Sequence, residues 1–110
     1  MVRKYQKFKD YLIKELHHFD HAKSFLETAI HEYENDNDIE AFMLALRYLV
    51  EAQGGVGKLS ERTHLNKQNL YKILSGKTTP RFDTTMSIIN GLGFHLSPHR
   101  LAINKGPVLK

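Results

Sequence analysis

The sequence contains no cysteine, which excludes disulfide bonds and metal sites built on thiolates. It also lacks any apolar run approaching the roughly 18 residues that a membrane-spanning helix requires. Its first residues, MVRKYQKFKD, hold no apolar stretch of the kind found at the centre of a signal peptide. These absences predict a cytoplasmic protein without a membrane segment.

What is present fits one folded domain. The chain has 110 residues, 41% of them hydrophobic, and its six Phe and five Tyr argue against wholesale disorder. The net charge of +4 is distributed unevenly: residues 1–19 carry +3, residues 20–51 carry −6 and residues 52–110 carry +7. The basic C-terminal half suits a polyanion, whereas the acidic middle suits water or a basic partner.

The apolar residues recur with a helical period through most of the chain. Residues 8–16 predict either a short helix or an extended arm docked by Phe8, Leu12 and Leu16. From Asp20, a suitable N-cap, an apolar stripe at helical spacing continues to Tyr33. This stripe is most simply core, with a dimer or toxin interface as the alternative.

A second helical stripe follows the polar run ENDND. It extends from Ile39 to Val50, and Asp38 is placed to cap its beginning. Gly54 and Gly55 are expected to stop this helix, because glycine tolerates the left-handed conformation that terminates helices.

The next stretch, VGKLSERTHLNKQNLYKIL, predicts two short helices separated by a turn of three or four residues. Leu59 supplies a core residue in the first helix, Leu65 one in the turn and Leu70 one on the inner face of the second. Asn66 is a strong N-cap type, so the second helix can begin there.

Helical geometry then decides which side chains of the second helix point outward. At about 100° per residue, Gln68 and Lys72 lie opposite Leu70, and Lys67 lies in the first turn. Asn69, Tyr71 and Ser75 lie at the margins. Amide and amine groups of this kind donate to phosphates and read base edges in the major groove, so the pattern favours a DNA-binding helix-turn-helix.

The segment after this helix extends the predicted interface. In the loop SGKTTPR, the side chains of Lys77, Thr78, Thr79 and Arg81 are of the types that bind DNA phosphates. RFDTTMSIINGLG then predicts a last helix that ends at Gly93, with an inner face formed by Phe82, Met86, Ile89 and Leu92. A short strand over residues 94–96 is the expectation beyond it, limited in length by Pro98.

The sequence gives little support for a metal site, a nucleotide-binding site or a catalytic site. His17, His18 and His21 include a pair four residues apart, but a metal needs three or four converging ligands and no second cluster is visible. No glycine-rich phosphate loop follows a strand, and neither Ser60 nor Ser75 has a recognisable catalytic partner. The sequence therefore predicts no metal, no cofactor and no enzyme.

The run from Val56 to Leu96 resembles the Xre/lambda-repressor-like helix-turn-helix family. It is most similar to the subgroup of probable addiction-module antidote proteins, which are HigA-like antitoxins, and Leu70 to Gly93 matches the subgroup's run LYKxLSGxxxPRFDTxxxIxxxLG. Two positions depart from the pattern: Ser60 stands where Ala is usual, and His64 where Gly is usual. Serine is small enough for close helix packing, and histidine adopts a positive φ at modest cost.

The resemblance implies an all-α fold, a five-helix lambda-repressor-like DNA-binding bundle with an additional N-terminal helical segment. It divides the chain into an N-terminal extension (1–35), the helix-turn-helix domain (36–93) and a C-terminal tail (94–110) that is a candidate dimerisation segment. The DNA-binding residues expected are Asn66, Lys67, Gln68, Asn69, Lys72, Ser75, Lys77, Thr78 and Arg81.

The function implied is that of a sequence-specific antitoxin of a type II toxin–antitoxin module. Such a protein neutralises a RelE/HigB-like ribonuclease toxin and represses its own operon. A stand-alone Xre-family or phage-type repressor is the alternative, and an interaction module without DNA binding is a third.

Double-stranded operator DNA, the toxin and a second copy of the chain are the expected partners. Two surfaces are candidates for the homodimer. One is the C-terminal set Phe94, Leu96, Leu101 and Ile103, which we favour, and the other is the N-terminal set Phe25, Leu26 and Ile30. The first leaves the acidic helices free for the toxin.

Overall fold

The structure is a computed structural model that describes residues 2–97. All regular structure in these residues is helical, so the expected all-α class is confirmed for them. The helices are α1 (Val2–Glu15), α2 (Phe19–Asp36), α3 (Ile39–Ala52), α4 (Val56–Thr63), α5 (Lys67–Leu74) and α6 (Phe82–Gly91). Four of them lie within residues 36–93, one fewer than the five expected for the helix-turn-helix domain with those bounds. None of the helices in residues 2–97 is long and apolar enough to cross a membrane.

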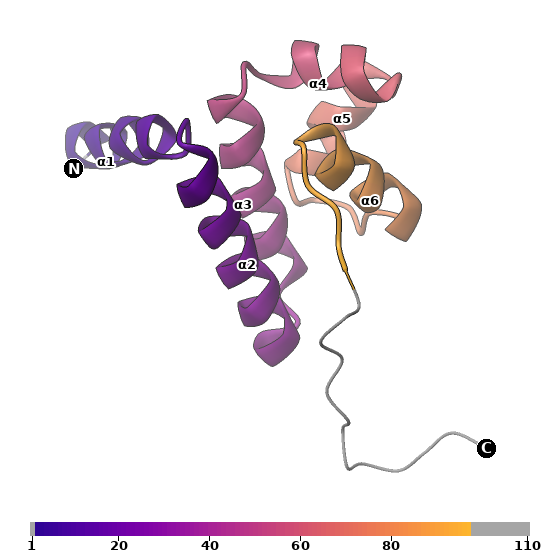
Figure 1. The fold of residues 1–110 in the computed structure, drawn as a ribbon, viewed down its shortest axis with the longest axis horizontal. Helices are drawn as coiled ribbons and strands as arrows, with labels where there is room; N and C mark the ends of the chain where they lie inside the picture. Colours follow the sequence, from indigo (N-terminus) through magenta and orange to yellow (C-terminus); the bar gives the residue numbers. More distant parts are fainter. Residues whose placement is uncertain (1, 98–110) are drawn as a thin grey trace.

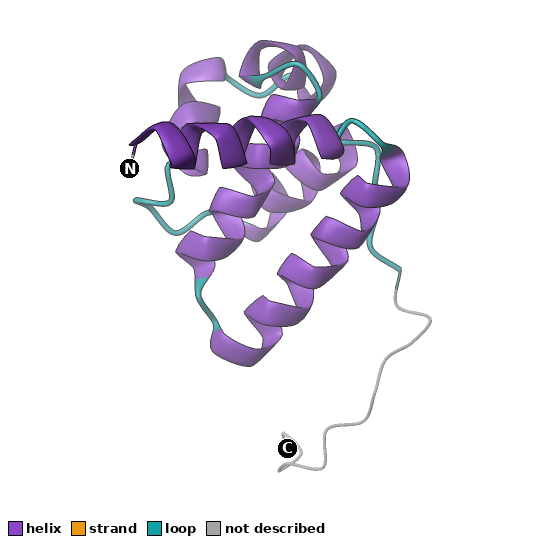
Figure 2. Ribbon diagram, turned by 90° about the vertical axis from the view of Figure 1, so that its left-hand side faces the viewer, coloured by secondary structure: helices purple, strands orange, loops and turns teal. Residues whose placement is uncertain are grey.

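The arrangement is centred on α3. This helix packs against α1, α2, α4 and α5, and α4 packs in turn against α5 and α6. Figure 1 shows α2 and α3 side by side as a helical hairpin, with α4, α5 and α6 gathered beside α3. In the turned view of Figure 2, α1 crosses over the end of this hairpin.

The core lies where the apolar stripes of these helices meet. Met43, Leu46 and Leu49 of α3 are completely buried, together with Leu70 of α5 and Ile88 of α6. Each fully buried side chain of this size contributes about 1.5–3 kcal/mol relative to an exposed one. The core therefore joins α5 and α6 to α3.

The first segment is a helix rather than an extended arm. Leu16, just after α1, is buried in the core as expected. Phe8 is 63% exposed, so the expectation that Phe8 packs the first segment against the core is wrong. Polar contacts add to the attachment: the Tyr5 and Tyr48 hydroxyls lie 3.2 Å apart, and the Lys9 Nζ lies 3.5 Å from the Glu51 carboxylate. The hydrogen bond with Tyr5 raises the pKa of Tyr48.

The helix starts follow the predicted caps only in part. The Asp38 carboxylate accepts a hydrogen bond from the Ala41 N–H at 3.0 Å, which confirms it as the cap of α3. Asp20 is not the cap of α2, since the His18 carbonyl already accepts from the Ala22 N–H at 2.9 Å and the helix begins at Phe19. Asp20 instead lies in the first turn, where a carboxylate complements the helix dipole.

The predicted end of α3 is confirmed, whereas the predicted end of α6 and the predicted burial of Phe82 are wrong. The stop after α3 is confirmed, since Gly54 and Gly55 have φ of 110° and 94°. At the other end of the domain, α6 finishes at Gly91, two residues before the predicted end. Phe82, the first residue of α6, is 79% exposed because it projects at the helix start, before α6 packs against the core.

The chain after α6 is not a strand in its described part. Residues 94–97 have no regular structure, so the strand expected over residues 94–96 is wrong for them. Phe94 stacks on Phe19 with ring centroids 4.9 Å apart, which uses its side chain for intramolecular packing. Leu101 and Ile103 of the predicted dimer surface lie outside the described residues.

Candidate nucleic-acid interface

The turn between α4 and α5 has the tight geometry that two short helices require. Only residues 64–66 separate the helices, and His64 adopts the left-handed conformation with φ 62° and ψ 17°. The predicted positive φ of His64 is therefore confirmed. Its N–H donates to the Ser60 carbonyl at 2.8 Å, which closes the last turn of α4.

Side chains of α4 hold the turn in place. The Ser60 hydroxyl donates to the Leu65 carbonyl at 2.6 Å, and the Thr63 hydroxyl accepts from the Leu65 N–H at 3.2 Å. Leu65 itself is half-buried against the core. The serine that departs from the family pattern thus supplies a hydrogen bond that an alanine cannot.

The second helix presents its polar face to solvent. The Asn66 carboxamide oxygen accepts from the Asn69 N–H at 3.1 Å, which confirms Asn66 as the N-cap of α5. Leu70 and Leu74 are buried, and Gln68 on the opposite side is exposed. Because the inner face is fixed by the core, the orientation of the outer face is fixed as well.

All of the side chains expected to contact DNA are exposed. They lie on consecutive parts of one segment: the cap and outer face of α5, its C-cap, the following loop and the residue before α6. They are Asn66, Lys67, Gln68, Asn69, Lys72, Ser75, Lys77, Thr78 and Arg81.

Two of these side chains also have structural roles. The Asn66 oxygen is engaged in the cap, so only its amide nitrogen is available to another molecule. The Ser75 hydroxyl donates to the Lys72 carbonyl at 2.6 Å and accepts a longer bond from the Lys77 N–H at 3.4 Å. Ser75 therefore shapes the exit of α5, and Lys77 follows it in the exposed loop.

Arg81 is the least available cation of the set. Its Nε and Nη2 atoms donate to the two carboxylate oxygens of Asp83 at 3.1 and 3.2 Å. The same contact lowers the pKa of the Asp83 carboxyl below its ordinary value. The pair is exposed to solvent, so its net contribution to folding is small, but it offsets the positive charge offered at the start of α6.

Two residues outside the expected DNA-binding set, Tyr71 and Arg47, lie on or beside α5 in the structure. Tyr71 on α5 is 57% exposed, at the margin where helical geometry places it. Arg47 of α3 lines a hollow with Leu74 and Ser75, and its buried Nε has no hydrogen-bond partner within residues 2–97. Tyr71 was detectable from its helical position, whereas Arg47 approaches α5 only through the packing of α3 on α5.

The side chain of Lys67, at the start of α5, extends to the first turn of α4. Its Nζ lies beside Gly57, 3.9 Å from the position that a Cβ would take there. Gly57 belongs to the first turn of α4, where backbone N–H groups have no partner within the helix. An ammonium group next to free N–H groups is a suitable arrangement for a phosphate.

The histidines near the start of α2 have ordinary local contacts. His21 Nδ1 lies 2.9 Å from the Glu15 carboxylate, and the rings of His18 and His21 meet edge to face with centroids 5.1 Å apart. Within residues 2–97 no three His, Cys, Asp or Glu side chains are grouped as metal ligands.

Comparison with known protein families gives a match over most of the chain. A family model described as probable addiction module antidote protein matches residues 8–100. No curated protein and no solved structure matches the chain. The matched range includes the whole of α2 to α6 and most of α1.

Proposed function

Because the chain belongs to the family of probable addiction module antidote proteins, we propose that it is the DNA-binding antitoxin of a type II toxin–antitoxin pair. An antidote implies a toxin as its partner, and the toxin we propose is a RelE/HigB-like ribonuclease neutralised by direct contact. The same chain represses the operon that encodes the pair. In this proposal α3 to α6 form the lambda-repressor-like DNA-binding domain.

The observation that supports DNA binding best is the exposed face of α5. A helix held by buried Leu70 and Leu74 carries amide and amine groups on its free side, next to a turn that fixes its angle to α4. In the proposed complex α5 enters the major groove and α4 rests on the DNA backbone. Gln68 then pairs with an adenine, and Lys72 with a guanine or a nearby phosphate.

The remaining contacts are proposed to position the protein rather than to read sequence. Lys67 and the first turn of α4 bind one phosphate, and Lys77 binds another from the loop after α5. Arg81 contributes less, because Asp83 competes for its guanidinium.

A homodimer is part of the proposal, since one helix-turn-helix covers only a few base pairs and specific sites are usually bound by two. An apolar groove of about 470 Å³ supports an interface near the C-terminal segment. Exposed Phe82 and Leu96 line it together with Met86 of α6 and Ile30 of α2. Replacing both Phe82 and Leu96 with serine should yield monomers in analytical ultracentrifugation.

A stand-alone repressor of the Xre or phage type is the second candidate. It shares every DNA contact with the antitoxin and differs only in having no toxin. The simplest discriminating observation is the reading frame adjacent to the gene, because a small basic protein encoded there favours the antitoxin.

The residue-level test of DNA binding is the Gln68→Ala variant. We expect it to lose about 1–3 kcal/mol of binding free energy for the operator, measured by fluorescence anisotropy, and almost nothing for scrambled DNA. An equal loss on both DNAs shows that Gln68 does not read sequence. Lys23→Ala on the far part of α2 is the control that should leave both affinities unchanged.

A further inference from the structure

The longest acidic part of the chain reaches the proposed DNA contacts at its α3 end, where Glu40 lies beside Gly76 and lines a hollow with Ser75. From residue 24 to residue 46 there are six Asp or Glu side chains and no Lys or Arg. This stretch forms most of α2 and the first half of α3, which pack together as a hairpin. Such a surface repels the DNA backbone and suits water or a basic partner.

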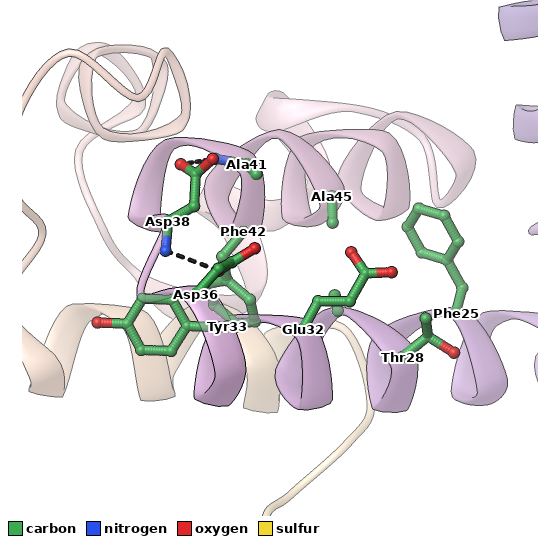
Figure 3. A pocket seen from close by; sticks show the side chains of 10 residues that line it. Phe25, Thr28, Glu32, Tyr33, Asp36, Asp38, Ala41, Phe42 and Ala45 are labelled. Carbon is green, nitrogen blue, oxygen red and sulfur yellow. Dashed lines mark hydrogen bonds between the residues drawn. The ribbon is translucent and has the colours of Figure 1, made fainter.

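A small groove opens between the two helices of this hairpin. Figure 3 shows Ala41 and Ala45 of α3 along it, with Phe25 at one end and Tyr33 at the other, and Ala29 of α2 also lines it. The cavity measures about 120 Å³. Its lining also includes three carboxylates, those of Glu32, Asp36 and Asp38, and contains no basic side chain.

The three carboxylates differ in what they already bind. Asp36 accepts from the Asp38 N–H at 2.8 Å, and Asp38 caps α3 through the Ala41 N–H at 3.0 Å. Among the described residues Glu32 has no hydrogen-bond or ion-pair partner, and Figure 3 shows its carboxylate over the groove, facing the side of Ala45. Glu32 is therefore the group most available to a cation from another molecule.

The size of the groove suits one side chain rather than a small-molecule ligand. Ligand sites usually measure about 300–1,000 Å³, whereas a cavity of about 150 Å³ holds a single benzene ring. Interface pockets of this size accept anchor residues, among which arginine is common. An apolar floor with a carboxylate at its rim fits arginine well, because its stem is apolar and its guanidinium binds carboxylates in a bidentate way.

We infer that the groove between α2 and α3 is the toxin-binding site and receives an arginine side chain of the toxin. The stem of the arginine lies on Ala29 and Ala45, and the guanidinium binds Glu32. This inference rests on the proposed function, which supplies the toxin. The groove shares Asp38 and Ala41 with the hollow beside Ser75, whereas Glu32 lines the groove and not that hollow. The toxin anchor is therefore proposed on the α2 side of the hairpin.

The test uses the full chain and the protein encoded by the reading frame adjacent to its gene. Binding is measured by isothermal titration calorimetry for the wild type, for Glu32→Arg and for Ala45→Leu, which fills the groove without changing charge. We expect each variant to bind at least thirty-fold more weakly, since an unpaired charge or a blocked anchor raises the dissociation rate. Circular dichroism melting and operator binding show that both variants are folded.

Glu27→Arg is the matched control, because it reverses the same charge on the same helix at an exposed position that does not line the groove. It should weaken binding less than about five-fold. The Glu32→Arg variant can then be tested against toxin variants in which one arginine is changed to glutamate. The toxin variant that restores binding identifies the arginine that occupies the groove. If the wild type binds and both groove variants bind equally well, the inference is overturned while the proposed function stands. If the wild type does not bind, both are overturned.

Discussion

Replacing Gly91 with alanine should destabilise the protein, although alanine normally favours a helix. Gly91 is the last residue of α6, where this helix packs against α4. A Cβ at this position would lie 2.6 Å from Thr63 Cγ2 and 2.9 Å from Leu59 Cδ1, closer than non-bonded carbon atoms approach. The added methyl group therefore forces α4 and α6 apart or moves these two side chains.

Neither neighbour of Gly91 is free to move. The Thr63 hydroxyl donates to the Leu59 carbonyl at 2.8 Å and accepts from the Leu65 N–H, so rotating Thr63 breaks two hydrogen bonds of the turn. Leu59 is 3% exposed and has no solvent to move into. Overpacking of this kind costs about 1–3 kcal/mol. The helix-propensity gain of up to about 1 kcal/mol offsets only part of it.

Gly57→Ala is the matched control, since it makes the same substitution in a helix where a Cβ meets its nearest atom at 3.9 Å. It should stabilise the chain by about 0.5–1 kcal/mol. Urea unfolding followed by circular dichroism measures both variants, with an unchanged m-value as the condition for comparison. A stabilising effect of Gly91→Ala, or equal effects of both substitutions, refutes the close packing of α4 and α6.

Four further predictions concern the turn and the charges near it. His64→Gly should raise the free energy of unfolding by about 0.5–1 kcal/mol, measured in urea, because a left-handed residue is relieved of its strain at some entropic cost. Lys77→Ala should lower the slope of log affinity against log salt by about one, and Asp83→Asn, which frees Arg81, should steepen it. In an NMR titration the Asp83 carboxyl should have a pKa below 3.8. Because folding lowers the pKa of Asp83, its ionised carboxylate stabilises the folded state slightly at a pH above the ordinary aspartate pKa. This stabilisation is lost as the pH falls through the pKa of the folded state.

The features that the sequence predicted well depend on local geometry. Asn66 caps α5 because a short amide side chain reaches the N–H three residues ahead, whatever the rest of the fold does. Leu70 is buried because a single apolar stripe leaves α5 one way to face the core. The left-handed turn at His64 followed from the spacing of the two helices and the residue type usual there.

The features that the sequence missed depend on contacts between distant segments. Phe82 continues the helical spacing of the apolar residues in α6, but its exposure is decided by where the helix begins relative to the core. Arg47 belongs to a mostly apolar helix, and only the packing of α3 on α5 brings it beside Ser75. The pairing of Arg81 with Asp83 depends on rotamers, which no pattern of residue types specifies.

The central claim is that the exposed face of α5 gives this antidote protein a specific DNA site. The most direct measurement is the affinity of the wild-type chain for the promoter of its own operon and for a scrambled duplex of equal length, by fluorescence anisotropy at about 150 mM salt. The promoter should bind at least about a thousand-fold more tightly than the scrambled duplex. Equal affinities, or no binding to either duplex, would contradict the central claim.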